Sequence, residues 1–376
     1  MKHIDLDSIS SYGRSAKTIA QTLLKDFADA GEVEKELRNL NLYPGLENLS
    51  HPDSTIFLGE SEKDLTDSGK KAVIEGRVVW EHTAAGEATR LDKGPKFFLE
   101  PRHLADYLKN RGKTPPPDLY PLNLGRRHLA QLIYEIRFLA WEAGLDPEFV
   151  LSRQNLLVVA SEEAMPRIFP AVIRDLKKLL PLENIWFMTQ PAFHGLDKTA
   201  EGWDYDLKSP KRLHNHGFVI MQKTMDKQVF YMTGEGTINY FSRQEFFREL
   251  EEFQDLVSYN IEDLDYLTSA LDFESIGLAM EMRDRDYGMM MEVLPNNPVR
   301  PVRGGLYAHD PGLEKDVVVE SFRLKDYRPE DIKYLNKNFN HYLEPAKIFQ
   351  KIKEEGLYMP LAVKDGFVYF QPVQGD

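Results

Sequence analysis

The chain has 376 residues, of which 42% are hydrophobic, enough for one large α/β core with an appended domain or for two to three domains. Its 60 acidic side chains outnumber 47 basic ones, and the net charge of -13 disfavours nonspecific binding to nucleic acid or to anionic lipid. The absence of cysteine excludes disulfides, thiolate zinc sites and cysteine nucleophiles, and it fits a reducing cytosol.

The first 70 residues are expected to form a helical N-terminal extension. Residues 1–12 are polar and charged, without the apolar core of a secretion signal, and no apolar run of membrane-spanning length follows. Residues 14–41 carry apolar side chains at helical spacing, and the Tyr-Pro-Gly sequence at 43–45 would end a helix there. We therefore expect a cytoplasmic protein with a domain boundary near residue 70.

A β-prone segment at 77–83 leads into small residues and then into cations. Small side chains let backbone N–H groups approach phosphate oxygens, and cations can neutralise the phosphate charge. The residues that would line this phosphate site are Ala84, Ala85, Gly86, Arg90 and Lys96. A strand that enters any tight turn would also use small residues, so this pattern alone leaves both interpretations open.

Beyond residue 71, short β-prone runs alternate with amphipathic ones. The expected strands are at 77–83, 155–160, 185–188, 217–222, 256–261, 276–282 and 317–321. The expected helices between them are at 126–143, 164–180 and 243–253. This alternation predicts a mixed, largely parallel sheet with helices on both faces, in which ligands bind at the carboxyl ends of the strands.

A second candidate site lies at 213–219, where a polar turn precedes an apolar run. Gly217 would let a flat base lie against the backbone, and His216 or Asn215 would hydrogen-bond its edge. A turn with surface histidines explains the same residues. His214 and His216 would also suit zinc, but no third ligand follows at a recognisable spacing.

Acidic residues follow the β-prone run at 256–261. Glu262 and Asp263 would lie at the carboxyl end of a central strand, where a carboxylate can hold Mg²⁺ against phosphate oxygens. Adjacent residues of a continuing strand point to opposite sides, so only one of the two would bind the ion directly. Acidic residues also commonly begin a following helix, which is the alternative interpretation.

Two further segments carry polar side chains suited to a phosphorylated sugar. Arg303 precedes Gly304 and Gly305, and arginine beside flexible backbone suits a phosphate oxygen, although a hairpin turn would use the same glycines. Glu320 ends a β-prone run, and the amides at 336–342 offer the donors and acceptors that sugar hydroxyls need. Asparagines in a loop are also common turn formers.

The chain after residue 329 looks helical through 352, with a final strand at 367–370. Residues 198–213 are expected to be a polar surface loop. We therefore expect a core at 71–330 and a C-terminal region at 331–376 that closes over it.

Taken in order, these segments resemble the eukaryotic-type UDP-sugar pyrophosphorylases, the family of UDP-N-acetylglucosamine and UDP-glucose pyrophosphorylases. The family's opening motif, roughly L-x-G-G-x-G-T-x-L-G and then P-K, is similar to residues 83–92 followed by Pro95-Lys96. Its N-V-D-N-L motif is similar to 260–264, where Glu262 takes the place of the metal-binding aspartate. Its V-K-G-G segment is similar to 302–305, with arginine for lysine.

Five more motifs occur in the family's order. The strand that ends in T-S-E resembles 158–162, and the F-F-x-Q segment near the uracil resembles 186–190. The turn that supports the nucleoside is similar to 214–217. The V-V-E strand that addresses the sugar resembles 318–320, and N-I-x-N-H-F resembles 338–342. The resemblance covers roughly residues 73 to 345, and its strength lies in the order of the motifs.

The resemblance implies a Rossmann-like nucleotide-diphospho-sugar transferase fold and a reaction of UTP with a sugar 1-phosphate, with Mg²⁺ as cofactor. The products would be a UDP-sugar and pyrophosphate. Neither nucleic acid nor a membrane is an expected partner, and the oligomeric state is left open. The implied roles are catalytic for Arg90, Lys96 and Arg303, nucleotide binding for Ala84, Ala85, Gly86, Gln190, His216 and Gly217, sugar binding for Gly304, Glu320 and Asn338, and metal binding for Glu262 and Asp263.

The chain also departs from the family pattern. Ala85 and Ala88 replace two glycines of the opening loop, and Asp92 replaces the last one. A methyl group would crowd any backbone position there that needs a positive φ or close phosphate approach. Two alternatives therefore remain: a nucleotide-sugar binding protein that has lost the chemistry, or a related glycosyltransferase with a D-x-D-like metal motif at 263–265.

Overall fold

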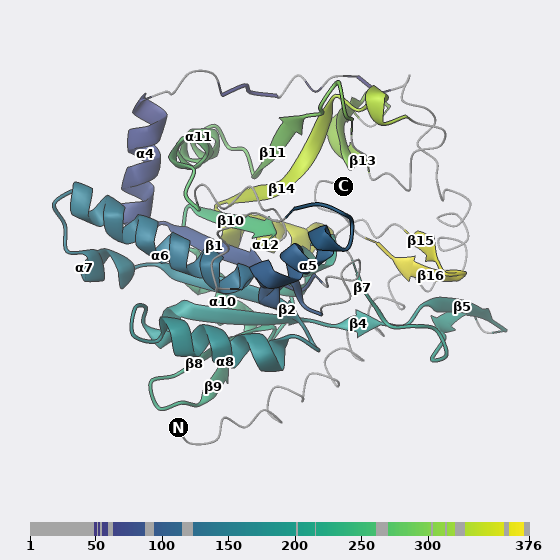
Figure 1. Cartoon of the computed structure of the whole chain (residues 1–376), viewed down its shortest axis with the longest axis horizontal. Coiled ribbons are helices and arrows are strands. Elements are labelled where there is room, and N and C mark those ends of the chain that lie inside the picture. The colour runs from purple at the N-terminus through teal and green to yellow at the C-terminus, as the bar shows by residue number, and fades with distance from the viewer. Residues whose placement is uncertain are drawn as a thin grey trace.

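The computed structural model describes residues 49–50, 52, 55–58, 63–86, 94–114, 123–200, 202–214, 216–260, 270–301, 304–312, 314–319, 328–356 and 361–371. The helical segment expected at 14–41 lies outside this range. Figure 1 shows a large central sheet with helices on either side of it.

Ten strands form the main sheet, in the order β13-β12-β14-β10-β1-β2-β3-β8-β9, with β11 paired to β14. They are β1 (Val78–Thr83), β2 (Asn155–Ser161), β3 (Ile185–Gln190), β8 (Val229–Met232), β9 (Ile238–Tyr240), β10 (Asp255–Asn260), β11 (Met289–Pro295), β12 (Leu306–Asp310), β13 (Lys315–Val319) and β14 (Tyr334–Leu343). The central strands β10, β1, β2 and β3 are parallel, and the outer pairings are antiparallel. The expected mixed sheet is confirmed.

Helices cover both faces of the main sheet (Figure 1). One face carries α4 (Lys63–Ile74), α6 (Leu124–Glu142), α7 (Pro147–Leu151), α8 (Met165–Leu176) and α11 (Phe273–Asp284), and the other carries α9 (His216–Lys223), α10 (Arg243–Leu250) and α12 (Pro345–Glu355). Alternation along β1 explains this division, because Val78 and Trp80 pack with the first group whereas Val79 packs with the second. The predictions of a helix at 126–143, 164–180 and 243–253 are confirmed.

Glycines let two of these helices cross closely. An added Cβ on Gly69 of α4 would lie 2.0 Å from the Phe273 carbonyl oxygen, and one on Gly277 of α11 would lie 2.0 Å from the Leu65 carbonyl oxygen. The two backbones are therefore in contact, which only residues without a side chain permit. This crossing attaches α11, the helix that follows β10, to the start of the described core.

Two predicted strands are wrong. Residues 217–222 lie in α9, and residues 276–282 lie in α11. Both segments are short apolar runs, and periodicity alone cannot distinguish a buried strand from a buried helix. In α11 the residues from Ser275 to Met280 are all buried, so the usual polar stripe of a surface helix is missing.

The predicted helix after residue 329 is also wrong in its first half. Residues 334–343 form β14, and only then does α12 begin. β14 pairs with β10, β11 and β12, so it lies inside the main sheet. The main sheet therefore continues past residue 330, where the sequence led us to expect the core to end.

A smaller sheet lies beyond the ends of the central strands (Figure 1). Its order is β15 (Leu361–Lys364), β16 (Phe367–Phe370), β5 (Leu196–Thr199) and β6 (Gly202–Tyr205), and β4 (Ala192–Phe193) pairs with β7 (Arg212–Leu213) nearby. The expected loop at 198–213 thus contains strands, and the final strand at 367–370 is confirmed. The remaining short helices are α5 (Pro101–Lys109), η2 (Lys96–Phe98), η3 (Leu182–Asn184) and η6 (Pro329–Asp331).

Within the described part of the chain, no helix has both the length and the apolar character needed to span a bilayer.

Candidate functional site

Several of the expected site residues follow strands that end together. Thr83 of β1 is level with Asn260 of β10, and Ser161 of β2 is level with Gln190 of β3. We call this edge of the main sheet the rim. Since β14 is antiparallel to β10, it begins beyond the end of β10, crosses the rim near residue 338 and then runs back along β10. The rim from β14 to β3 covers four strand spacings, or about 19 Å.

The two ends of the loop after β1, at Gly86 and Lys96, lie next to each other. The Ala84 N–H donates to the Val159 carbonyl at 2.6 Å, and the Lys96 N–H donates to the Gly86 carbonyl at 3.0 Å. The second bond closes the loop, so Lys96 lies beside Gly86 at the rim. Ala85 does not take a positive φ, so its methyl group causes no backbone strain at that position.

Packing in the core determines where Lys96 lies. The next residue, Phe97, is 1% exposed, and an added Cβ on Gly125 of α6 would lie 2.1 Å from its ring. The Leu124 N–H donates to the Leu99 carbonyl at 2.7 Å. The short helix η2 is therefore anchored against the first turn of α6, and Lys96 is held at its start.

At the end of β3, Gln190 connects the rim to the segment before α9. The Gln190 side-chain Nε2 donates to the His214 backbone carbonyl at 2.6 Å. The Gln190 backbone carbonyl accepts a hydrogen bond from the Glu162 N–H at 3.2 Å. The His214 ring stacks on Phe193 with 4.3 Å between centroids and is 1% exposed. His214 is therefore part of a buried aromatic cluster, so the interpretation as a surface histidine is wrong for this residue.

His216 and Gly217 form the first turn of α9. The backbone N–H groups of a helix's first turn have no partner inside the helix and are directed outward, so the site presents helix-end donors rather than the flat strand expected. Burial lowers the pKa of His216 to about 4 and that of His214 to about 3, so both imidazoles are neutral near pH 7. Among the described residues, no group of three or more His, Asp or Glu is arranged to hold a metal.

The segments expected to meet the sugar are neighbours at the other end of the rim. The Asn336 N–H donates to the Gly305 carbonyl at 3.3 Å, which places Gly304 and Gly305 beside the start of β14. Asn338 lies two residues before Asn340, which pairs with Ser258 of β10. The backbone of Asn338 is therefore level with the end of β10, at the rim.

Six of the expected site residues lie outside the described residues. They are Arg90, Asn215, Glu262, Asp263, Arg303 and Glu320. Their assigned roles remain predictions.

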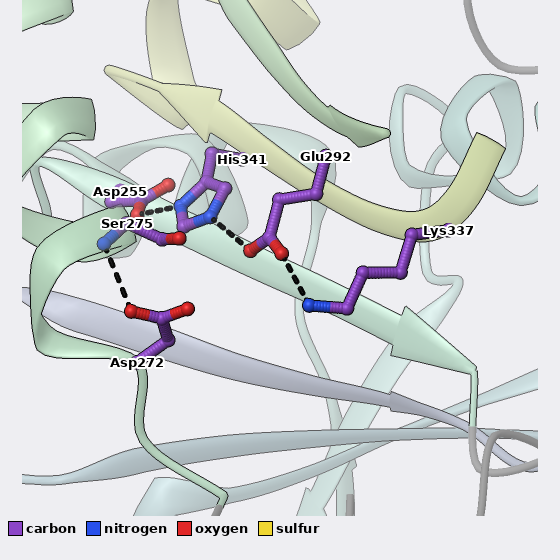
Figure 2. Close-up of polar contacts among 6 residues, drawn as sticks. All are labelled: Asp255, Asp272, Ser275, Glu292, Lys337 and His341. Carbon is purple, nitrogen blue, oxygen red and sulfur yellow. Dashed lines mark hydrogen bonds and ion pairs between the residues drawn. The ribbon is translucent and has the colours of Figure 1, made fainter. Parts of the chain in front are cut away.

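A row of charged side chains that runs from the start of β10 toward the rim was not expected from the sequence (Figure 2). His341 Nδ1 lies 2.7 Å from Asp255 Oδ2, and His341 Nε2 lies 3.4 Å from Glu292 Oε1. Lys337 Nζ then lies 2.6 Å from Glu292 Oε2. Burial alone would lower the pKa of His341, but Asp255 and Glu292 raise it to about 10. The row therefore alternates in sign and ends at Lys337, near the rim.

The sequence held one signal of this charged row, the histidine in the 338–342 motif. Its partners could not be found there, because Asp255 is 86 residues and Glu292 is 49 residues away. Antiparallel pairing of β14 with β10 and β11 brings the three side chains together.

Comparison with known proteins identifies the architecture. No protein-family model and no curated protein sequence matches the chain. Among solved structures, it is similar to a UDP-N-acetylglucosamine pyrophosphorylase from Trypanosoma brucei with an inhibitor, at 17% identity and a TM-score of 0.60. The alignment covers 89% of this chain and 64% of that protein, so this chain spans under two thirds of its length.

Two other structures support the same likeness. A mutant UDP-glucose pyrophosphorylase from Leishmania major aligns at 15% identity and a TM-score of 0.56, covering 98% of this chain and 70% of that one. A putative UDP-N-acetylglucosamine pyrophosphorylase from Entamoeba histolytica aligns at 15% identity and a TM-score of 0.52, covering 84% and 71%. The chain thus has the α/β fold of these UDP-sugar pyrophosphorylase structures.

Proposed function

We propose that this protein is a uridylyltransferase that joins UTP and a sugar 1-phosphate to give a UDP-sugar and pyrophosphate. The observation that carries the proposal is the arrangement of segments along the rim. There the loop after β1, the start of α9 and the Gly304 segment come from distant parts of the sequence and lie along one edge of about 19 Å. The fold shared with UDP-sugar pyrophosphorylases supports the same reading.

The reaction requires two anions to be brought together while charge builds on the phosphates. A sugar phosphate oxygen attacks the α-phosphorus of UTP in line, and pyrophosphate leaves. Lys96 and the backbone N–H groups near Gly86 would hold the leaving phosphates, with Arg90 adding a second cation. Arg303 would hold the sugar phosphate. Positioning and charge stabilisation supply most of the rate in such transfers.

Uridine would bind at the β3 end of the rim. Because Gln190 Nε2 already donates to the His214 carbonyl, its Oε1 is the acceptor that a uracil N3–H would meet. The neutral imidazole of His216 and the first turn of α9 at Gly217 would complete recognition of the base. The sugar would bind at the opposite end, near Gly304, Asn338 and Glu320.

We also propose Mg²⁺ as the cofactor, held by Glu262 with Asp263. Carboxylate oxygens are ligands that Mg²⁺ prefers, and the bound ion would neutralise phosphate charge. The lack of cysteine supports the cytosol as the place of this reaction.

The test is pyrophosphate release from UTP with a panel of sugar 1-phosphates. We expect turnover with at least one sugar, and we expect Lys96→Ala to lower kcat/KM by roughly 100-fold, as removal of a charge-stabilising donor does. Lys109→Ala, which removes an exposed lysine at the end of α5, is the matched control and should keep full activity. Folded protein that turns over no sugar would contradict catalysis.

One substitution favours a second candidate, a nucleotide-sugar binding protein without the chemistry. Ala85 stands in the loop after β1 where the family has glycine, and its methyl group would take up space that a close phosphate approach needs. Calorimetry would then show UDP-sugar binding without Mg²⁺-dependent turnover. Transfer of the sugar from a UDP-sugar to an acceptor would instead indicate a glycosyltransferase.

A further inference from the structure

A pair of opposite charges is completely buried beneath the rim. Lys223 Nζ, at the end of α9, lies 2.7 Å from Glu81 Oε2 in β1, and both side chains are 0% exposed. The Ser258 hydroxyl of β10 donates to Glu81 Oε1 at 2.8 Å. The ammonium also lies 5.8 Å from the centroid of the Tyr342 ring and 5.5 Å from that of Phe349.

Stability alone does not account for this pair. Removing two charges from water costs more than their attraction returns in many proteins, and apolar side chains of similar volume often serve as well. Burial lowers the pKa of Lys223, although the Glu81 carboxylate opposes that shift. The pair instead fixes the position of α9 relative to β1, because a buried ammonium without a contacting carboxylate would be strongly destabilising.

The pair joins the two elements that carry the two halves of the proposed nucleotide site. Glu81 lies three residues before Ala84, where the phosphate loop begins. Lys223 lies at the opposite end of α9 from His216 and Gly217. The helix has 8 residues. It is one rigid rod of about 12 Å, so a shift at its last residue moves its first turn.

Two other buried contacts hold α9 to β3 but not to β1. Gln222 is 0% exposed, and its Nε2 donates to the Thr189 carbonyl at 2.7 Å. Gln190 Nε2 donates to the His214 carbonyl just before the helix. The Glu81–Lys223 contact, in contrast, joins α9 directly to β1, the strand that leads into the phosphate loop.

We propose that Glu81 and Lys223 are positioning residues that hold the base-binding turn of α9 at a set distance from the phosphate loop of β1. This inference rests on the proposed function, since the ligand that spans the two is a uridine nucleotide. Neither side chain touches the nucleotide, and the pair acts through His216, Gly217 and the loop at 84–86.

The test is a double variant, Glu81→Met with Lys223→Met, which removes both charges and keeps their approximate length. We expect it to fold with a thermal midpoint close to that of the wild type. We expect the calorimetric Kd for UDP and the KM for UTP to rise between about 10- and 100-fold, the cost of displacing a binding group by about 1 Å. The KM should rise more than kcat falls.

The matched control is Arg126→Gln with Asp175→Asn, which removes an ion pair between α6 and α8 whose atoms lie 2.5 Å apart. It should leave the Kd for UDP unchanged. An unchanged Kd in the folded Glu81/Lys223 double variant would overturn this inference alone. Wild-type protein that binds no uridine nucleotide would overturn the proposed function and this inference with it.

If the double variant does not fold, Ser258→Ala decides the question, because it removes one hydrogen bond to Glu81 and leaves both charges in place. A raised Kd for UDP in that folded variant supports the positioning role. An unchanged Kd overturns it.

Discussion

His341 is the residue whose charge state the structure defines most clearly. It lies between the carboxylates of Asp255 and Glu292, is 1% exposed, and has a pKa raised from 6.5 to about 10. A raised pKa in the folded state means that folding favours the protonated ring. The stabilisation is complete below pH 6.5 and is lost as the pH rises through about 10.

We therefore predict a pH-dependent effect of His341→Gln on the free energy of unfolding. The variant should be less stable than the wild type at pH 6, because two buried carboxylates lose the cation between them. The difference should become smaller as the pH rises toward 10. Urea unfolding of both proteins at several pH values measures it. A difference of the same size at pH 6 and pH 10 would show that the charge of the ring is not responsible.

At the scale of elements, the crossing of α4 and α11 depends on one glycine in each helix, Gly69 and Gly277. We predict that Gly277→Ala destabilises the protein by about 1–3 kcal/mol, because the new methyl group is forced against the backbone of α4. The contact is with the Leu65 carbonyl oxygen, at 2.0 Å from an ideal Cβ. Thermal or denaturant unfolding measures the loss.

The matched control is Gly234→Ala, where an added Cβ would lie 3.8 Å from Glu183 Oε1 and no positive φ is required. It should change the free energy of unfolding by less than the Gly277 variant does. Equal stability of the Gly277 variant and the wild type would mean that α4 and α11 can move apart without cost.

The elements that the sequence predicted wrongly are those without a clear local period. α9 and α11 are short and buried around most of their circumference, so an apolar run is all that the sequence shows. β14 carries polar residues at 336, 337 and 338, which hid its alternation, and its pairing with three strands decides its conformation. In contrast, α10 begins with a capping box of Ser242 and Glu245. This local sequence signal forms both of its hydrogen bonds in the structure.

At the scale of the whole molecule, the proposed ligand connects distant parts of the chain. A ligand that binds only the folded protein stabilises it, by about 2.7 kcal/mol at a hundredfold excess over Kd. We predict that UTP with Mg²⁺ raises the thermal midpoint and supports pyrophosphate release with a sugar 1-phosphate. Chelation with EDTA should abolish turnover, and added Mg²⁺ should restore it. Full turnover in EDTA would contradict the metal role assigned to Glu262 and Asp263.

Sequence alone determined the fold class and placed several candidate residues at strand ends. Strong local patterns identified β1, β2, β3 and β10 and the helices α6, α8 and α10, and the order of the motifs pointed to the pyrophosphorylase-like fold. The sequence also placed the loop after β1 and Gln190 at strand ends, where the structure has them, because a strand end followed by small or polar residues is a local signal. The roles of all the candidate site residues stay predictions, and Arg90, Arg303, Glu262, Asp263 and Glu320 lie outside the described residues.

Only the tertiary structure decided which residues meet. The closure of Lys96 onto Gly86, the contact of Gln190 with His214 and the buried pair of Glu81 and Lys223 each join separate segments. These contacts depend on strand order and on the faces that the helices cover, which no local period encodes. A single sequence shows where a strand ends, but the packing of the whole chain determines what lies beside that end.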